Sequence, residues 1–268
     1  MRRRPAIVLA AVALAAAAGP VEGAAGRGVG PREVDVMTWN VASARLTGGD
    51  LEPLAATIEA ADPDVVAVQE LDRSWSRTGG VDQPALLAAR LGMSYVWDSN
   101  YDCRRRDTDD DDRCEYGTAI FTRLPIDSAS VRRYGLPTGG EPETRGLTRA
   151  TVRVDGRPLE VFNTHLGLRP ATRRAQIYRL VNLVGTAPRP LVVLGDFNTP
   201  PFAPEAKPLF RRFGDVQAIG GYRFQRTTAS SRIDYVFASR RMEVFGARVL
   251  PTRHSDHRPV VAELRLPR

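Results

Sequence analysis

The sequence predicts a single α/β domain over residues 33–268, and three observations support this fold class. Short apolar runs typical of strands alternate with amphipathic runs typical of helices. With 43% apolar and 26% charged residues, the composition is that of a folded globular protein and excludes a disordered or coiled-coil chain. No linker-like stretch, repeat or low-complexity segment interrupts residues 33–268, so we expect one domain.

The first part of the domain is predicted to alternate strands with helices. In chain order we expect a strand at 34–39, a helix at 51–61, a buried strand at 65–68 and a helix at 84–91. The second helix has Pro84 in its first turn, where a backbone N–H is not needed. It ends at Gly92, which suits a left-handed C-terminal cap.

The remainder is predicted to be richer in strands. Four successive strands at 116–122, 128–134, 148–154 and 159–164, separated by Gly and Pro turns, indicate an antiparallel stretch. An amphipathic helix is expected at 172–184, followed by an apolar strand at 191–194. The last strands are expected at 232–238, 244–250 and 259–266.

Residues 1–25 are predicted to be a signal peptide, and residues 26–32 a short linker before the domain. Arg2, Arg3 and Arg4 form a basic start, residues 7–18 are wholly apolar, and small residues follow. This apolar run is shorter than the roughly 20 residues that a membrane span requires, so a cleaved signal is favoured over an uncleaved anchor. Cleavage near Ala18 and cleavage near Ala25 both stay open. The protein is therefore expected to be secreted or extracytoplasmic.

The two cysteines, Cys103 and Cys114, lie in one polar loop. Because export places the chain in an oxidising compartment, we expect them to form a disulfide. The loop between them carries several aspartates but lacks the glycine and the distal glutamate of an EF-hand. A solvated loop is therefore favoured over a calcium site.

Polar residues gather where the predicted strands end. The residues that share this position are Asn40, Glu70, His165, Asp196, Asn198, Asp234, Asp256 and His257. Each of them alone is commonly a turn residue or a helix cap. Together they predict one site, because strand ends meet at a common edge in α/β folds.

Seven short motifs occur in the order that one superfamily shows. They are Thr38-Trp39-Asn40, Gln69-Glu70, Tyr116-Gly117, Asn163-Thr164-His165-Leu166, Gly195-Asp196-Phe197-Asn198, RIDYVF at 232–237, and Ser255-Asp256-His257-Arg258-Pro259. On these motifs, residues 33–266 resemble the endonuclease/exonuclease/phosphatase superfamily, and segments 70–73 and 76–83 look like its secreted metal-dependent hydrolase branch. The resemblance implies a DNase I-like four-layer α/β sandwich, with two mixed β-sheets packed face to face and helices outside.

The resemblance also implies a divalent-metal site made of Glu70, Asn40 and Asp256. Oxygen ligands suit Mg²⁺, and Mn²⁺ is the alternative. A phosphate ester resists hydroxide because both are anionic. Its hydrolysis therefore needs a cation, a positioned water and donors for the developing charge.

The same resemblance assigns catalytic roles. His257 is expected to pair with Asp234 in a carboxylate–imidazole dyad, and it acts either as general base or as a phosphate contact. Asp196 matches the residue that orients or deprotonates the attacking water. Asn198 and His165 match groups that hold the phosphoryl oxygens.

Further candidate contacts to the substrate are Tyr116, Arg145 and Asn163. Tyr116 is expected to donate one hydrogen bond, while Arg145, before a predicted strand, and Asn163 are expected to contact phosphate. Arg73 is a weaker candidate, because a chain with 38 basic residues offers many such placements.

Two other chemistries fit the sequence poorly. Lys207 is the single lysine, so a lysine-centred mechanism and a P-loop are nearly excluded. The three histidines, His165, His254 and His257, raise the alternative of a zinc centre. Prolines bracket the last two and disfavour a helical His-x-x-His pair, and His254 is expected to lie on the surface.

These observations predict an exported, divalent-metal-dependent phosphoesterase, and in the first place a phosphodiesterase. The alternatives are an extracellular nuclease and a sphingomyelinase-like phospholipase, because the formal charge of +7 suits any polyanion. The scarcity of lysine argues against a processive nuclease, and no apolar, aromatic hairpin is evident for membrane insertion. A small phosphorylated metabolite or a lipid headgroup is therefore favoured.

A catalytically silent module that binds a phosphorylated ligand is the hypothesis from a different class. Such a module would be expected to have lost Glu70, Asp196 or the Asp234 and His257 pair, and all of them are present. We expect a monomer without an obligate protein partner.

Overall fold

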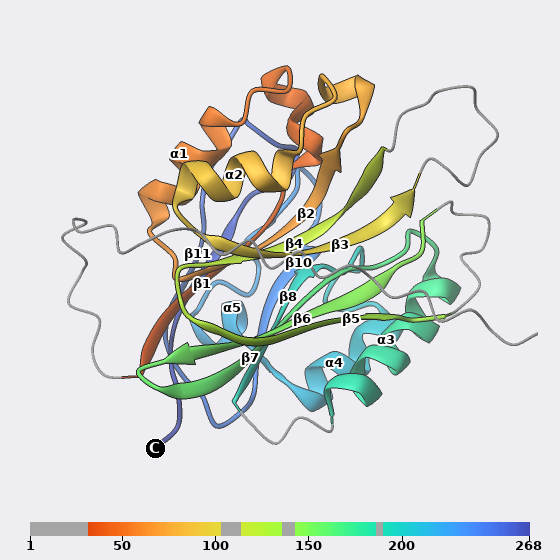
Figure 1. The fold of residues 1–268 in the computed structure, drawn as a ribbon. Coiled ribbons are helices and arrows are strands. Elements are labelled where there is room, and N and C mark those ends of the chain that lie inside the picture. The colour runs from red at the N-terminus through yellow and green to blue at the C-terminus, as the bar shows by residue number, and fades with distance from the viewer. Residues whose placement is uncertain (1–31, 103–113, 136–142, 186–189) are drawn as a thin grey trace, which may run out of the picture.

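The computed structural model describes residues 32–102, 114–135, 143–185 and 190–268. Its strands form two six-stranded sheets that pack face to face, with helices on the outer faces (Figure 1). The predicted signal peptide, the linker before residue 32, and Cys103 lie outside the described residues. The disulfide between Cys103 and Cys114 therefore stays a prediction. In the described ranges, no helix has the length and apolar character needed to cross a membrane.

Sheet A has the strand order β11-β12-β1-β2-β4-β3. Its strands are β1 (Glu33–Asn40), β2 (Val65–Arg73), β3 (Ser94–Asp102), β4 (Glu115–Thr122), β11 (Glu243–Val249) and β12 (Val260–Arg265). β1 and β2 run parallel, and the other neighbouring pairs are antiparallel. The ends of β1 and β2 therefore share an edge with the starts of β4 and β12.

Sheet B has the strand order β5-β6-β7-β8-β10-β9. Its strands are β5 (Ile126–Arg133), β6 (Gly146–Val154), β7 (Arg157–His165), β8 (Leu191–Asp196), β9 (Gly214–Asp215) and β10 (Asp234–Ala238). Only β7 and β8 run parallel. Both sheets are thus mixed, as the resemblance implied.

Helices complete the four layers. On the outer face of sheet A lie α1 (Glu52–Ala61) and α2 (Gln83–Leu91), and on that of sheet B lie α3 (Pro170–Val184) and α4 (Lys207–Arg212) (Figure 1). The shorter helices are α5 (Val216–Ile219), η1 (Ala42–Thr47), η2 (Ser76–Thr78) and η4 (Pro204–Ala206). The α/β fold class and the DNase I-like four-layer sandwich are confirmed.

The apolar run in β2 shows how the layers pack. Side chains alternate along a strand, so Val65 and Ala67 enter the core between the sheets, while Val66 and Val68 pack beneath α1 and α2. All four side chains are fully buried. A strand covered on both faces has a continuous apolar sequence, which is the pattern that predicted this strand.

The expected elements form with shifted ends, and β3, β9, α4 and α5 are additional. β3 escapes prediction because its sequence, SYVWDSNYD, ends in polar residues, although Asp98 and Asn100 are buried. α3 begins at Pro170, where proline suits the first turn. β2 continues well past Val68, to Arg73, which changes the position expected for Glu70.

Candidate active site

Three strands of sheet B place acidic and imidazole side chains side by side. His165 at the end of β7 lies beside Asp196 at the end of β8, and Asp196 lies beside Asp234 at the start of β10. All three side chains are buried. The regular strand register therefore gathers residues that are far apart in the sequence.

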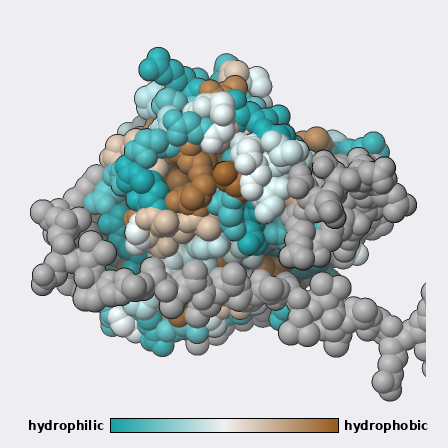
Figure 2. All heavy atoms as spheres, turned by 45° about the horizontal axis from the view of Figure 1, so that its top comes forward, coloured by the Kyte–Doolittle hydropathy of each residue, from teal (hydrophilic) through white to brown (hydrophobic). Residues whose placement is uncertain are grey.

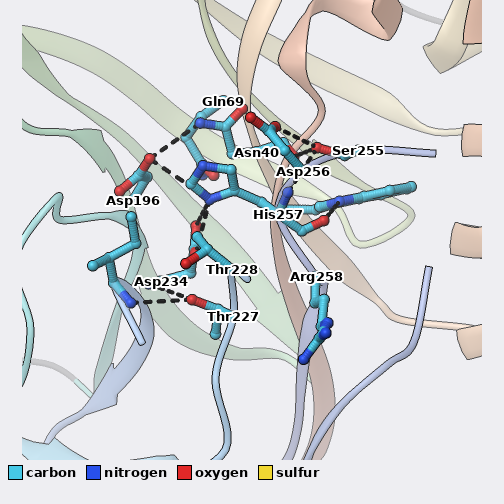
Figure 3. Close-up of polar contacts among 12 residues, drawn as sticks. Asn40, Gln69, Asp196, Thr227, Thr228, Asp234, Ser255, Asp256, His257 and Arg258 are labelled. Carbon is cyan, nitrogen blue, oxygen red and sulfur yellow. Dashed lines mark hydrogen bonds and ion pairs between the residues drawn. The ribbon is translucent and has the colours of Figure 1, made fainter. Parts of the chain in front are cut away.

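Asp196 contacts Asn40, His165 and His257, and Figure 3 shows the contacts with Asn40 and His257. Its Oδ2 atom accepts a hydrogen bond from Asn40 Nδ2 at 3.1 Å, and it lies 3.5 Å from His165 Nε2 and 3.8 Å from His257 Nδ1. Its Oδ1 atom accepts the backbone N–H of Asn198 at 2.8 Å. Because Asn40 ends β1, this carboxylate links sheet B to sheet A.

His257 and Asp234 form the expected dyad. His257 Nδ1 lies 3.0 Å from Asp234 Oδ2 and 3.1 Å from Oδ1 (Figure 3). The backbone of His257 is fixed because its carbonyl accepts Trp39 Nε1–H at 2.9 Å. The backbone N–H of Asp234 donates to Thr227 Oγ1 at 3.2 Å. Since Nδ1 faces the carboxylate, Nε2 is the ring nitrogen that can meet a substrate.

The cluster shifts the pKa values of its members. Burial, and then the neighbouring Asp234 carboxylate, raise the pKa of Asp196 to about 7. Burial lowers the pKa of His257, but the carboxylates of Asp234 and Asp196 outweigh this effect and raise that pKa to about 10. Burial, Arg145 and His257 hold the pKa of His165 well below its usual value. At neutral pH one imidazole is therefore protonated and the other is neutral.

Glu70 lies inside β2 and not at its end, which corrects the position expected from the sequence. The register with β4 shifts between Gln69 and Leu71, so Glu70 occupies a β-bulge. Its φ of +59° lies in the left-handed region that residues other than glycine rarely adopt. The side chain is 20% exposed, and its Oε1 atom accepts a hydrogen bond from Asn40 Nδ2 at 2.9 Å.

The donor set suits a hard divalent cation. One ligand atom each from Asp196, Asp234 and His257 lie within 4.8 Å of one another. Asn40 connects this group to the Glu70 carboxylate, and Asp256 is exposed on the neighbouring loop. Carboxylate oxygens are the ligands that Mg²⁺ and similar ions prefer, and a cation would offset the mutual repulsion of buried carboxylates.

Asn40 itself presents its NH₂ group to the cluster. Nδ2 donates to both Glu70 and Asp196, while Oδ1 accepts the backbone N–H of Ala42 at 3.0 Å. In this orientation Asn40 bridges the two carboxylates. Its role as a direct metal ligand stays a prediction.

Arg145 provides a buried cation beside the cluster. Its side chain is 4% exposed, and Nη2 lies 2.6 Å from Glu143 Oε2. Nε and Nη1 have no hydrogen-bond partner among the described residues. The segment 143–145, which precedes β6, is fixed to β3, because the backbone N–H of Thr144 donates to the Asn100 carbonyl at 2.7 Å. Buried donors without partners are costly, so this guanidinium is suited to receive an anion.

Tyr116 lies near Arg145 and Glu70. Burial raises the pKa of Tyr116 well above its usual value, and the charge of Glu70 adds to this effect. The phenol therefore keeps its proton and can donate a hydrogen bond. Trp75 packs edge-on against it with 6.5 Å between ring centroids, and the guanidinium of Arg77 lies 5.5 Å from its ring.

The phosphate contact predicted for Asn163 does not fit its surroundings. The side chain is fully buried, and Nδ2 donates to the carbonyls of Val68 at 3.0 Å and Ala119 at 2.8 Å. Its Oδ1 atom accepts Gln69 Nε2–H at 2.8 Å. Because these bonds use both amide hydrogens, Asn163 joins sheet B to sheet A and has no donor left for phosphate.

Arg73 also has a structural role. Its Nε atom lies 2.9 Å from Asp82 Oδ2 and its Nη1 atom 3.0 Å from Glu115 Oε2. The guanidinium lies 5.7 Å from the Trp97 ring centroid. These neighbours account for its charge without a substrate.

His254 lies outside the cluster. It lines a groove with Pro53, Ala60 and Leu250 on the side of the molecule where α1 lies. Figure 2 looks onto the face that α1 and α2 cover and shows apolar residues in a hollow between hydrophilic ones. In the described part of the chain, no group of candidate metal ligands contains two histidines. The three-histidine zinc centre is therefore not supported.

Sequence reasoning missed residues that hold the site in place. Ser255 Oγ donates to the Asn40 carbonyl at 2.7 Å and accepts the His257 N–H at 3.1 Å (Figure 3). The Ser-Asp-His-Arg-Pro motif contained this residue, so a signal was available. Thr227, which fixes Asp234, belongs to a segment with no recognisable motif.

The sequence pattern of the Endonuclease/Exonuclease/phosphatase family matches residues 37–257. Among curated proteins, YbhP of Escherichia coli K12 is 34% identical over 85 residues, which cover 31% of this chain and 33% of that protein. The chain thus matches about a third of the length of this relative.

Solved structures resemble most of the chain. An endonuclease/exonuclease/phosphatase from Beutenbergia cavernae is 26% identical, with a TM-score of 0.67 over 88% of this chain and 72% of that one. The human Nocturnin catalytic domain, which has a bound sulfate anion, is 23% identical, with a TM-score of 0.66 over 88% and 94%. A mannosyl-6-phosphatase from Bacteroides thetaiotaomicron is 18% identical, with a TM-score of 0.65 over 86% and 99%. The last two likenesses show the fold alone.

The family match, the four-layer sandwich and the acidic cluster agree. Enzymes of this family hydrolyse phosphate esters, including those of nucleic acids, and generally use divalent metals. The chain belongs to the endonuclease/exonuclease/phosphatase family.

Proposed function

We propose that this protein is an exported, magnesium-dependent phosphodiesterase that cleaves its substrate with an activated water. The observation that carries the proposal is the cluster around Asp196, a carboxylate of raised pKa between the neutral His165 and the protonated His257. Near neutral pH, Asp196 can therefore accept one proton while His257 donates another.

The metal would be held by the carboxylates of Glu70 and Asp256, with Asp196 and Asp234 close by. When bound, the ion supplies charge neutralisation at the phosphoryl oxygens and lowers the pKa of a water. Mg²⁺ is the first choice for these oxygen donors and Mn²⁺ the second.

Asp196 accepts the proton of the attacking water. Its raised pKa makes it a stronger base than an ordinary aspartate, and hydrogen bonds from Asn40 and the Asn198 backbone fix its orientation. The water oxygen bonds to phosphorus while the bond from phosphorus to the leaving oxygen breaks.

His257 donates a proton from Nε2 to that leaving oxygen. Asp234 holds Nδ1 and keeps the ring protonated, which favours a general acid over the general base that the sequence left open. The proton lost by His257 and the proton gained by Asp196 balance one turnover.

Arg145, His165 and Asn198 would hold the phosphoryl oxygens. Arg145 offers two buried N–H donors, and His165 is a neutral donor. Asn198, held at a φ of +51°, donates one amide hydrogen to the Leu166 carbonyl at 2.9 Å, which leaves the other for substrate. Glu143 partly neutralises Arg145, so the site suits the single charge of a diester better than the double charge of a monoester.

The proposal is tested on the mature protein with an aryl phosphodiester and the matching aryl phosphomonoester. We expect the diester to be hydrolysed with Mg²⁺ or Mn²⁺, EDTA to abolish turnover, and Asp196→Asn to be inactive while keeping the wild-type circular dichroism spectrum. Full turnover in a metal-stripped sample would refute the metal dependence of the reaction. Hydrolysis of the monoester alone would refute the diesterase assignment.

The predicted export and monomeric state are part of this proposal. They are checked by the intact mass and the light-scattering mass of protein recovered from the culture medium. Retention of residues 1–25 in a cell-bound product would contradict cleavage and export.

A further inference from the structure

Large apolar side chains are exposed on the loops around the active site. Phe202 and Phe224 are 78% and 77% exposed, and Leu168 and Leu46 are 64% and 58% exposed. Exposed single hydrophobics are common on protein surfaces, but a group of them around a functional site commonly marks an interaction surface.

These residues share one edge of the sandwich. Leu46 lies in η1, directly after β1, while Leu168 and Phe202 follow the ends of β7 and β8. Phe224 lies in the segment that leads into β10, whose first residue is Asp234. All four are therefore attached to strand ends that carry residues of the Asp196 cluster.

Two contacts fix the segment around Phe224 at this edge. Gln225 Oε1 accepts the backbone N–H of Val249 at 3.2 Å, and the Thr227 carbonyl accepts the backbone N–H of Arg258 at 2.6 Å. Arg258 is the neighbour of His257, and its side chain points away from the dyad (Figure 3). The phenylalanine thus lies on a loop held against the residue that follows the catalytic histidine.

In three of these four loops, arginines lie next to the exposed apolar residue. Arg45 precedes Leu46, Arg169 follows Leu168, and Arg223 and Arg226 flank Phe224, all of them exposed. Within the described ranges, no ion pair engages Arg169, Arg223 or Arg226. The segment 216–233 contains three arginines and no acidic residue. The surface around the site is therefore apolar and cationic together.

We propose that this edge of the molecule docks onto an anionic lipid bilayer. The docking surface consists of Leu46, Leu168, Phe202 and Phe224 together with Arg45, Arg169, Arg223 and Arg226. The apolar side chains enter the headgroup region, and the arginines contact lipid phosphates. Docking brings the Asp196 cluster to the membrane surface, so the substrate class is the phosphodiester of a lipid headgroup. The docking stands without the proposed activity, whereas the choice of substrate rests on it.

The mixture of residue types favours lipid over nucleic acid. Single-stranded nucleic acid binds to aromatic rings on which bases stack, and Leu46 and Leu168 have no such ring. The apolar side chains come from separate loops at one edge, and of the arginines beside them only Arg45 makes an ion pair in the described ranges, with Glu70 at 3.9 Å. This arrangement matches a lipid bilayer, whose surface is anionic and whose interior is apolar. The sequence contains no evident apolar, aromatic hairpin, and this surface has no local sequence signature because its members come from different loops.

The test is sedimentation of the full mature protein with vesicles of phosphatidylglycerol and phosphatidylcholine in equal parts, with EDTA present to prevent turnover. We expect Phe202→Ala/Phe224→Ala to weaken vesicle binding at least roughly tenfold, since each ring loses its apolar contact. Arg223→Gln/Arg226→Gln should remove most of the preference over pure phosphatidylcholine vesicles, and high salt should do the same to wild type.

The matched control is Leu86→Ala/Tyr178→Ala, which removes side chains that are 50% and 58% exposed on α2 and α3. This control should bind vesicles as wild type does. Wild-type vesicle binding by Phe202→Ala/Phe224→Ala, an equal loss in the control, or capture of single-stranded DNA but not vesicles would overturn the docking.

Hydrolysis of a soluble aryl phosphodiester separates the two proposals. Phe202→Ala/Phe224→Ala should hydrolyse it at the wild-type rate, because neither side chain belongs to the cluster. Vesicle binding without any diester hydrolysis by wild type would refute the proposed function and leave the docking. Hydrolysis without vesicle binding would do the reverse.

Discussion

Sheet A and sheet B have related topologies but equip the active site differently. In each sheet one parallel pair, β1 with β2 or β7 with β8, is flanked by antiparallel strands. Sheet A contributes Asn40 from the end of β1 and Glu70 from a bulge within β2. Sheet B contributes His165 and Asp196 from the ends of β7 and β8.

The two edges differ in regularity and burial. On sheet B, His165, Asp196 and Asp234 stand in unbroken register and are buried, and their mutual charges shift pKa values. On sheet A, a bulge with a left-handed residue turns Glu70 to a partly exposed position.

Under the proposed function, this difference is a division of roles between the two sheets. Regular pairing fixes charged groups in a dry setting, where they hold and move protons. A bulge aims a carboxylate where water can reach it, which suits an ion that keeps part of its hydration shell. Substitutions at each edge test this division.

The largest effect is expected within the edge of sheet B. His257→Ala should lower single-turnover rates roughly a hundredfold or more, the scale of a lost acid–base group, and Asp234→Asn somewhat less. Because Asp234 acts through the ring, the double variant should resemble His257→Ala alone. His254→Ala is the control and should be unaffected. Defects that multiply in the double variant would show that the two residues act separately.

Glu70→Gln should act on the metal and not on the protons. We expect the Mg²⁺ concentration for half-maximal rate to rise roughly ten- to a hundredfold, while the rate at saturating metal falls far less. The exposed Glu59→Gln on α1 is the control. Titration with Mn²⁺, followed by its paramagnetic signal, should show the same weakening without turnover. An unchanged metal requirement would place the ion elsewhere.

Asn163→Leu should lower stability by removing hydrogen bonds between the two sheets. It removes the partners of two buried carbonyls and of Gln69, so the free energy of unfolding in urea should fall by about 1–3 kcal/mol. The KM for a soluble diester should stay unchanged, in contrast to a phosphate contact. Asn182→Leu, at an exposed position of α3, should be neutral. A raised KM with unchanged stability would restore Asn163 to the substrate site.

The smallest effect concerns stability and pH in EDTA. The pKa of His257 is raised to about 10 on folding, so its stabilisation is complete below the unfolded pKa of about 6.5 and is lost as pH rises to 10. Asp196, with its pKa raised to about 7, destabilises the fold as it ionises between about pH 4 and 7.

Stability of the metal-free protein should therefore decrease from acidic to alkaline pH over this range. His257→Gln should flatten the decrease above pH 7, as measured by urea unfolding at several pH values. Increasing stability between pH 7 and 10 would contradict the raised histidine pKa.

The sequence by itself determined the α/β alternation, the family and most of the residues in the cluster. Periodicity and turn residues are local signals, so the buried run Val65 to Val68 and the helix ending at Gly92 were readable directly. Asp196, Asp234 and His257 were identified because polar residues at strand ends stand out against apolar runs, and because their motifs keep the family order.

Only the tertiary structure decided which strands pair. The strand pairing in turn decided the bulge at Glu70 and the buried hydrogen bonds by which Asn163 links the two sheets. It also decided the burial of Arg145 and the exposure of Phe202 and Phe224, neither of which has a local signature. The physical reason is that register, desolvation and pKa are set by neighbours that are distant in sequence. Asp196 shows this most clearly, because its pKa depends on residues from β1, β10 and the loop before β12.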